Sequence, residues 1–445
     1  GGGRGRESMS CEKKEFLFIP EYFPQFPFDW ELTTLGKLIE PERKISYGIV
    51  QPGSHCDDGV PIVRVNNLDS GHVIESGMLK VAKEIEAKYH RTRLSGGEVL
   101  LSLVGTLGRC AVVPEKMKGY NIARAIAVIP VVRRIEAEWV KYCLQVEYSQ
   151  TFIQKNATTT VQATFNLGDV SKLIIPIPHA KERIAITRTL KALDDKIELN
   201  NRINKTLEEM AQALFKQWFV DFEFPDENGQ PYKSSGGEME ESELGLIPKG
   251  WRVGKVGDIA NLVRDNVTPN DFEKESCYIG LEHIPRKSLA LTQSGKAEDV
   301  SSNKTRFQES DILFGKLRPY FHKVVFAPCN GICSTDILVI RPIKSIYWGS
   351  ALMWLFSDEI VRHADACSEG TKMPRANWAD IARYSISLAT DRVLAEFTNL
   401  MQPMCKQIKS NIHMSQNLTS LRDALLPKLM SGEIRVPIEE VATDV

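Results

Sequence analysis

The sequence has almost no net charge, no long apolar run and no cysteine framework, and each absence excludes a class of protein. Its 56 basic and 57 acidic side chains nearly cancel, so total charge indicates no polyanionic partner. No apolar run approaches the roughly eighteen residues of a membrane helix and no signal peptide is present, so we expect no membrane partner. The nine cysteines are scattered and odd in number, which fits a reducing cytoplasm.

Sequence motifs of catalysis are missing as well. The chain contains no P-loop, no strand-borne G-x-G-x-x-G, no H-E-x-x-H, no G-x-S-x-G and no N/D-P-P-Y/F tetrapeptide of an amino-methyltransferase. The eight histidines are isolated, and Cys329 and Cys333 near His322 lack a second pair at metal-ligand spacing. We therefore expect a chain that recognises a ligand or serves as a scaffold, with no catalytic residues, no metal and no cofactor of its own.

Charge is nevertheless distributed unevenly along the chain. Residues 31–178 carry 18 basic against 15 acidic side chains, and residues 250–390 carry 18 against 16. Residues 220–249 carry 2 against 8 and are rich in Gly, Ser and Glu, so we predict an acidic surface linker without a core. The two large segments are mildly basic, which permits nucleic-acid binding.

The stretch 180–219 is predicted to form one long helix. It contains no Gly or Pro, and at ~1.5 Å per residue it would be roughly 55–60 Å long. Asn200 and Asn204 interrupt its two apolar rows, and a buried Asn fixes register and partner. Alternatively, the helix is rolled so that Ile203 and Met210 face inward and the Asn pair lies at the edge. The rows have the seven-residue spacing of a coiled coil and comprise Ile186, Leu190, Leu193, Ile197, Leu207, Ala211, Leu214 and Trp218.

A second segment, 391–431, matches the first with a constant shift of 211 positions. Asn200 falls on Asn411 near the midpoints of the two helices, so an antiparallel pairing would bring them close together. Pro403 falls on Ala192 and predicts a kink or a late start of the second helix. The shift extends upstream of the helices, so one unit has been used twice.

The predicted fold is α+β, with two repeated mixed α/β domains separated by two long antiparallel helices in a coiled coil of pseudo-twofold symmetry. The frames of the two domains are alike, but Gly105–Arg109 of the first corresponds to Leu317–Phe321 of the second. Unlike loops on a common frame predict unlike ligands. The boundaries are a leader at 1–28, domains at 29–179 and 250–390, helices at 180–219 and 391–432, the linker at 220–249 and a tail at 433–445.

Several of these stretches resemble one family. The run Ile174–Phe224 strongly resembles the central conserved region of type I restriction-modification specificity (S) subunits, and Leu421–Ile434 looks like their distal conserved region. Gly105–Arg109 and Leu313–Tyr320 resemble short phrases of their target-recognition domains. The resemblance covers essentially Asp29 to Ile434.

The resemblance implies a non-catalytic subunit of a type I restriction endonuclease and adenine-specific DNA methyltransferase complex. In that family two target-recognition domains each read one half of a split double-stranded DNA sequence. The long helices dock two methyltransferase (M) subunits, and restriction (R) subunits complete the assembly. S-adenosylmethionine, ATP and Mg are then expected on the partner subunits and not on this chain.

Basic, amide and aromatic residues on the unlike loops are the candidates for contacts to phosphates and base edges. For each of them the alternative is a solvated charge or a fold-stabilising pair. The candidates are Asn66, Asn67, Arg91, Arg93, Thr106, Arg109 and Gln162 in the first domain, and His283, Lys316, Arg318, Tyr320, Lys372 and Arg375 in the second.

For partner docking, the sequence favours the outward face of the helices and an aromatic cluster at the end of the first helix. The alternative is that the cluster caps the helices against a recognition domain. The cluster comprises Phe215, Trp218, Phe219, Phe222 and Phe224.

Two other functions stay open from the sequence. One is a stand-alone scaffold whose two repeated domains bind proteins. The other is a fragment of a single-chain restriction enzyme whose catalytic half is missing. The bases recognised are not predictable, because loop residues translate into base contacts only through geometry.

Overall fold

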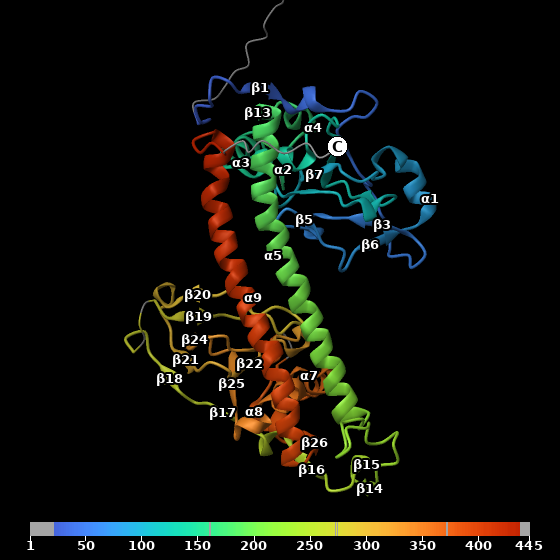
Figure 1. The fold of residues 1–445 in the computed structure, drawn as a ribbon, viewed down its shortest axis with the longest axis vertical. Coiled ribbons are helices and arrows are strands. Elements are labelled where there is room, and N and C mark those ends of the chain that lie inside the picture. The colour runs from blue at the N-terminus through green and yellow to red at the C-terminus, as the bar shows by residue number, and fades with distance from the viewer. Residues whose placement is uncertain (1–21, 160–161, 272, 274, 371–372, 437–445) are drawn as a thin grey trace, which may run out of the picture. The chain divides into compact units, whose positions relative to one another are not determined.

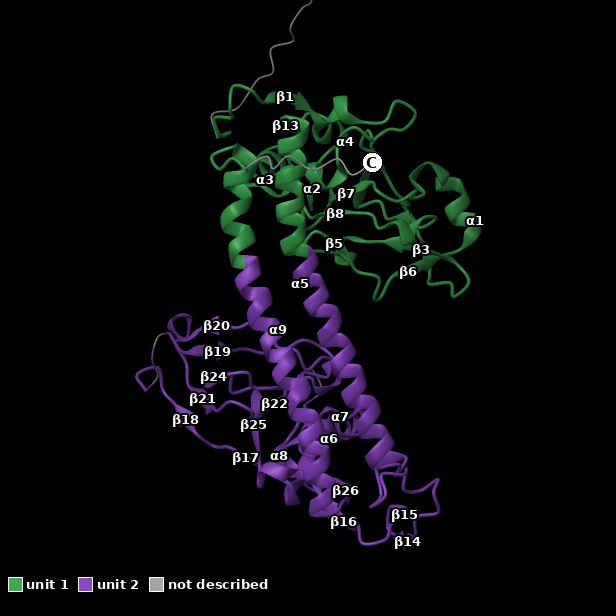
Figure 2. Ribbon diagram, in the orientation of Figure 1, with its two compact units in different colours: residues 1–194, 420–445 green, residues 195–419 purple. Residues whose placement is uncertain are grey.

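The structure is a computed structural model that describes residues 22–159, 162–271, 273, 275–370 and 373–436. It divides into two compact units (Figure 2). Unit 1 comprises residues 1–194 and 420–445, and unit 2 comprises residues 195–419. The chain enters unit 2 within one long helix and leaves it within another, so each long helix contributes one part to each unit.

The two long helices are α5, Ala180–Phe215, and α9, Asp391–Ser431 (Figure 1). A π-helical turn at Lys216–Val220 continues α5. The late start predicted for α9 is wrong, because the helix begins twelve residues before Pro403. Val393, Leu394 and Phe397 bury the first turns of α9 in unit 2, which offsets the roughly 3 kcal/mol that an internal proline costs.

Within unit 2, α5 and α9 are antiparallel neighbours joined through buried amides. Asn411 Nδ2 donates to Asn204 Oδ1 at 2.8 Å, and Asn200 Nδ2 donates to Ser415 Oγ at 3.1 Å. Asn411 therefore bonds to Asn204, and Asn200, which the sequence predicts to lie close to Asn411, is one helical turn further along α5. Asn200 and Asn204 are 0% and 3% exposed whereas Met210 is 46% exposed, so the rolled-helix alternative is also wrong.

The Asn204–Asn411 pair predicts a non-additive pattern of stabilities. We expect Asn411→Leu to lower the free energy of unfolding by about 1–3 kcal/mol, because it leaves the Asn204 amide buried without its partner. Asn204→Leu combined with Asn411→Leu should recover most of that loss, because two apolar side chains then face each other. Urea titration of the four proteins of this cycle measures the coupling, and additive losses would contradict it.

Unit 1 contains small sheets flanked by short helices. Strands β1 and β13 pair, a four-stranded antiparallel sheet has the order β2-β10-β7-β8, and a three-stranded sheet has the order β6-β3-β9. Two further pairs are β4–β5 and β11–β12. The bounds are β1 Glu31–Thr34, β2 Ser46–Tyr47, β3 Val60–Val63, β4 Leu68–Asp69, β5 His72–Val73, β6 Leu79–Val81, α1 Lys83–Glu86, β7 Val99–Ser102, β8 Cys110–Val112, β9 Asn121–Ile122, β10 Ile126–Ile129, α2 Ala137–Gln145, α3 Glu147–Lys155, β11 Thr158–Thr159, β12 Ala163–Thr164, α4 Leu167–Val170 and β13 Ile174–Ile177.

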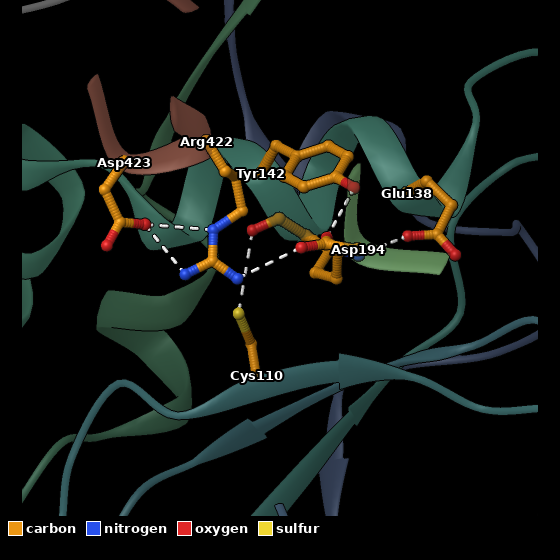
Figure 3. A network of polar contacts seen from close by, with 7 residues as sticks. Cys110, Glu138, Tyr142, Asp194, Arg422 and Asp423 are labelled. Atoms are coloured by element: carbon orange, nitrogen blue, oxygen red, sulfur yellow. Dashed lines mark hydrogen bonds and ion pairs between the residues drawn. The ribbon is translucent and has the colours of Figure 1, made fainter. Parts of the chain in front are cut away.

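A buried polar network joins α2, α5 and α9 inside unit 1 (Figure 3). Asp194 of α5 accepts hydrogen bonds from Tyr142 Oη at 2.7 Å and from Arg422 Nη1 at 3.1 Å. Lys141 Nζ lies 3.4 Å from Asp194 and 2.6 Å from Glu138. Asp194 and Lys141 are 4% and 2% exposed. One buried carboxylate therefore contacts two cations and fixes both long helices to α2 in this unit.

Unit 2 has a four-stranded antiparallel sheet of order β17-β25-β22-β23 and a five-stranded sheet of order β18-β21-β24-β19-β20. Strands β14–β15 and β16–β26 form two further pairs. The bounds are β14 Met239–Ser242, β15 Gly245–Pro248, β16 Arg252–Lys255, β17 Ala260–Leu262, β18 Asn266–Val267, β19 Cys277–Ile279, β20 Gly295–Lys296, β21 Lys304–Phe307, β22 Ile312–Gly315, β23 Val324–Phe326, β24 Gly331–Cys333, β25 Ile337–Pro342, α6 Trp348–Phe356, α7 Asp358–Ala366, α8 Trp378–Ala382 and β26 Ser385–Leu388.

The four-stranded sheets of the two units have matching strand orders. In unit 1 Ile129 lies opposite Val99, and in unit 2 Ile340 lies opposite Ile312. Each unit also has one parallel pair, β3–β9 in unit 1 and β19–β24 in unit 2. The second sheets differ, because unit 2 has five strands where unit 1 has three.

The linker at 220–249 is mostly exposed, but it is not without structure. Strands β14 and β15 form a hairpin, and the Phe224 ring stacks on Tyr232 at 4.6 Å and on Trp251 at 5.0 Å between centroids. The expectation that this composition supports no packing is therefore corrected. Its few aromatic residues pack against Trp251, which lies beyond the linker.

The aromatic cluster predicted for partner docking is buried in unit 2. Phe215, Trp218, Phe219 and Phe224 are between 2% and 5% exposed, and Phe222 is half-buried. The Phe219 ring lies 4.9 Å from that of Phe397. The structure thus corrects the docking prediction for this cluster, because these side chains form part of the core between the helices and the sheet domain of unit 2.

Candidate nucleic-acid interface

Each unit carries a tight turn at the same position of its four-stranded sheet. In unit 1 the turn joins β7 to β8, and in unit 2 it joins β22 to β23. Gly105 and Gly108 of the first turn have φ values of 80°. Arg318 and His322 occupy the corresponding places of the second turn with φ values of 51°. A left-handed conformation costs a non-glycine residue about 1–2 kcal/mol, so the second turn holds two side chains at an energetic cost.

A returning segment braces each turn in the same way. Phe165 N donates to Leu103 O at 2.9 Å in unit 1, and Ala376 N donates to Lys316 O at 2.8 Å in unit 2. Arg318 N in addition donates to Pro374 O at 2.7 Å. In unit 1 the Ser102 hydroxyl donates to Thr106 O at 2.6 Å. The backbones of the turns are therefore fixed while their side chains differ.

A cleft of about 930 Å³ opens beside the turn of unit 1. Tyr47, which is 50% exposed, and the exposed side chains of Arg124 and Gln162 line it. A guanidinium can bind phosphate oxygens, an amide can bind base edges, and an aromatic ring can stack on a base. Of the residues predicted in unit 1, the cleft includes Gln162, and exposed Thr106 lies on the turn itself.

One of the unit 1 predictions, Asn67, is corrected, and another, the exposed Arg93, stays a prediction although it is paired within the fold. Asn67 is 1% exposed, accepts from Arg64 N at 3.0 Å and donates to Ile74 O at 3.0 Å, so its amide is used within the fold. Arg93 holds the buried carboxylate of Glu86 through two hydrogen bonds of 2.9 and 2.5 Å, and this bonding lowers the pKa of Glu86. Both residues match the fold-stabilising alternative.

The other unit 1 candidates are exposed but lie outside the cleft. Asn66 and Arg91 are exposed, and neither lines it. Arg109 is exposed at the end of the turn, and its Nη1 donates to Leu68 O at 3.1 Å. These three stay predictions.

In unit 2 the turn concentrates positive charge and aromatic surface. Tyr320 is 51% exposed. Lys316 and Arg318 precede it on the same turn. Arg318 Nε is buried and has no hydrogen-bond partner among the described residues. The guanidinium of Arg286, from a neighbouring loop, lies 3.8 Å from the centroid of the Phe321 ring.

The remaining unit 2 candidates differ in their surroundings. His283 is half-buried, and its Nδ1 accepts from Gly280 N at 3.0 Å inside a tight turn; as a DNA contact it stays a prediction. Arg375 is exposed, and its Nε donates to Asp336 at 3.3 Å. Lys372 lies outside the described residues.

Sequence inspection missed basic and aromatic residues that belong to the frame rather than to the unlike loops. Tyr47 and Arg124 line the unit 1 cleft, and Arg286, Lys287 and Lys323 surround the unit 2 turn. Burial and the charge of Arg286 lower the pKa of Lys323. Of these residues, the adjacent basic pair Arg286 and Lys287 is the signal in the sequence that points to a site of positive charge.

His322 gives the unit 2 turn a pH dependence. Burial lowers the pKa of His322, whose Nε2 lies 2.8 Å from Phe356 O and whose Nδ1 lies 3.2 Å from Asp358. The unfolded chain takes up this proton near pH ~6.5 and the folded chain only at lower pH, so stability should fall as pH drops below about 6.5. We expect His322→Asn, which tolerates φ > 0, to lose part of this slope in urea titrations at several pH values. An unchanged slope would contradict the assignment.

The described residues contain no group of three His, Cys, Asp or Glu side chains arranged to hold a metal ion. Among the same residues, no helix has both the length and the apolar character needed to cross a membrane. The eight cysteines in the described part of the chain are all free thiols.

Comparison with known proteins finds similarity to one kind of protein. Residues 27–209 match the model of the type I restriction modification DNA specificity domain. The EcoBI specificity subunit of Escherichia coli is 30% identical over 221 residues, which are 47% of this chain and 46% of that protein. The match thus spans about half the length of that relative. The EcoDI specificity subunit of Escherichia coli is 22% identical over 437 residues, 92% of this chain and 90% of that protein.

A solved structure shares the fold. The S subunit of a type I restriction-modification system from M. genitalium superimposes with a TM-score of 0.54 at 12% identity, covering 91% of this chain and 98% of that one. At this identity the likeness concerns the fold alone. Because a specificity-domain model matches residues 27–209 and several specificity subunits match the sequence, the chain is similar to the specificity subunits of type I restriction-modification systems.

Proposed function

We propose that this chain reads a split double-stranded DNA target, with the turn and cleft of unit 1 contacting one half and the turn of unit 2 contacting the other. One observation carries the proposal. The two units have a turn at the equivalent position of their four-stranded sheets, and the backbones of these turns are braced alike while their side chains differ. Gly105 exposes backbone in the first turn, whereas Arg318 and Tyr320 of the second turn carry charged and aromatic groups. Such a pair of turns suits two different base sequences.

The long helices are proposed to set the spacing between the halves as an antiparallel coiled coil, with the two domains as pseudo-twofold repeats. Helix α5 has 36 residues and is therefore about 54 Å long, which corresponds to at most about 16 base pairs at 3.4 Å. The buried amide pairs between α5 and α9 in unit 2 support this role, because buried amides fix the register of a helix pair.

The complex is proposed to contain two methyltransferase subunits and restriction subunits, which bind S-adenosylmethionine, ATP and Mg, while this chain remains non-catalytic. The outward face of the helices supports docking, because several apolar side chains of unit 2 are exposed there. They are Leu199 and Met210 on α5 and Leu400 and Met414 on α9, each 40–46% exposed.

The test is a selection from random DNA. The full chain is purified with the methyltransferase encoded beside it, and bound duplexes are sequenced from a random pool, with the methyltransferase alone as control. We expect a motif of two short sequences at a fixed spacing that the control does not enrich. Enrichment of no motif would contradict DNA reading and favour a protein-binding scaffold.

A further inference from the structure

The hairpin β14–β15 in unit 2 exposes leucine on a rigid support. Register places Glu241 opposite Leu246, and Leu246 is 58% exposed whereas its neighbour Ile247 is 4% exposed. Leu244, at the hairpin tip, is 45% exposed. One face of the hairpin therefore joins the core of unit 2, and the other presents two leucines to solvent.

The hairpin also carries uncompensated negative charge. Glu240, Glu241 and Glu243 are exposed, and no Lys, Arg or His of the described chain lies within ion-pair distance of them. Lys249, which follows β15, is paired with Glu238, and the charge of Glu240 also contributes to raising the pKa of Lys249. The leucines are thus surrounded by carboxylates, which repel DNA phosphates and attract a basic protein surface.

The fold holds this hairpin in one conformation. Ser242 Oγ donates to Gly245 O at 2.6 Å, and Leu244 N donates to Ser242 Oγ at 3.2 Å. Tyr232 Oη donates to Glu238 O at 2.8 Å, and the Tyr232 ring stacks on Phe224 in the aromatic core. A partner would therefore meet a preformed surface and would lose little entropy in ordering it.

A cleft of about 510 Å³ lies beside the hairpin. Glu243 from the hairpin and Asp258 from the adjoining domain line it, together with Lys255 and Val253. Asp258 is already paired with Arg252 and accepts from Lys255 N, so Glu243 is the carboxylate that suits a Lys or Arg side chain of a partner at the edge of the leucine contact.

We propose that β14–β15 is a docking point for the methyltransferase subunit, which would offer an apolar pocket for Leu246 and Leu244 rimmed by Lys and Arg. The inference rests on the proposed function, because it takes the partner from there. Charge complementarity selects the occupant: the carboxylates around the leucines disfavour DNA and favour a basic protein face. The buried aromatic cluster then supports the hairpin from within unit 2 and does not itself contact the partner.

The test uses the full chain and the purified methyltransferase encoded beside it, with affinity measured by calorimetry at two salt concentrations. We expect Leu246→Ala to weaken binding about tenfold or more, because a buried leucine contact is lost. Glu241→Lys combined with Glu243→Lys should weaken binding further and reduce its salt dependence. Glu227→Lys, an exposed charge change in the same linker, and Ile343→Ala, an exposed apolar truncation, are the matched controls and should bind like wild type.

The outcomes separate this inference from the proposed function. If wild type binds the methyltransferase and the hairpin variants bind equally well, the docking point is refuted while the function stands. Variants that bind the methyltransferase normally but alter the selected DNA motif would also overturn it. If wild type itself does not bind the methyltransferase, the proposed function fails and this inference with it. Unchanged melting temperatures are expected for the variants, since all the substituted side chains are exposed.

Discussion

Replacing Asp194 by alanine is expected to destabilise unit 1 by about 3–5 kcal/mol, the usual cost of removing one partner from a buried ion pair. The substitution leaves Lys141, 2% exposed, without one of its two carboxylates and removes the acceptor of the Tyr142 hydroxyl. It also removes the hydrogen bond by which Arg422 of α9 is held in the same unit. No apolar contact replaces these bonds, so the loss should be large.

Hydrogen–deuterium exchange of the full chain measures this loss locally. Peptides from α2 and β8 should exchange about 100-fold faster or more in Asp194→Ala, whereas peptides from the five-stranded sheet of unit 2 serve as an internal reference. Asp423→Ala is the matched control: Asp423 also accepts from Arg422, but its side chain is 59% exposed, so its removal should cost less than about 1 kcal/mol. Equal effects of the two substitutions on exchange would show that the buried network contributes no more to stability than the exposed pair does.

The sequence predicts the long helices because they are encoded by periodicity, and a constant shift is the basis of the predicted repeat. The absence of Gly and Pro in 180–219 and the constant shift of 211 positions require no tertiary information. The sequence predicts that Asn200 and Asn411 lie close together but not which amides bond, because Asn200 and Asn204 lie in adjacent rows and only the packed structure decides which of them bonds to Asn411. The late start predicted from Pro403 is wrong, because the burial that holds the first turns of α9 is not visible in the sequence.

The candidate site was harder to predict, because residue type does not reveal what a side chain already contacts. Asn67 and Arg93 have the chemistry of DNA contacts, but they satisfy Ile74 O and the Glu86 carboxylate inside the fold. Conversely, Tyr47 and Arg124 were missed because they come from separate strands and loops that meet at the cleft only after folding. Arg318 was chosen for its charge, although its left-handed backbone and its unpartnered Nε are the stronger reasons.

Arg318→Ala is accordingly expected to weaken one half of the DNA motif and to leave the other half unchanged. A bidentate guanidinium contact to a base contributes about 1–3 kcal/mol of discrimination, so preference at the affected positions should fall roughly 5- to 150-fold. Arg318→Gly removes the same side chain but relieves the strain at φ 51°, so it should show the same loss of preference with higher stability than Arg318→Ala.

The comparison of three substitutions decides what the side chain does. Arg318→Lys keeps the charge but lacks the planar fork, so it should retain non-specific affinity and lose base preference if Arg318 reads a base, and retain both if it contacts only phosphate. Arg383→Ala removes an exposed arginine at the end of α8, which pairs with Asp380, and should change neither half. The measurement is competitive binding of duplexes altered in one half at a time to the complex with the methyltransferase. Equal losses in both halves for Arg318→Ala would refute the assignment of one half to each unit, because a side chain braced within the unit 2 turn would then be acting on both.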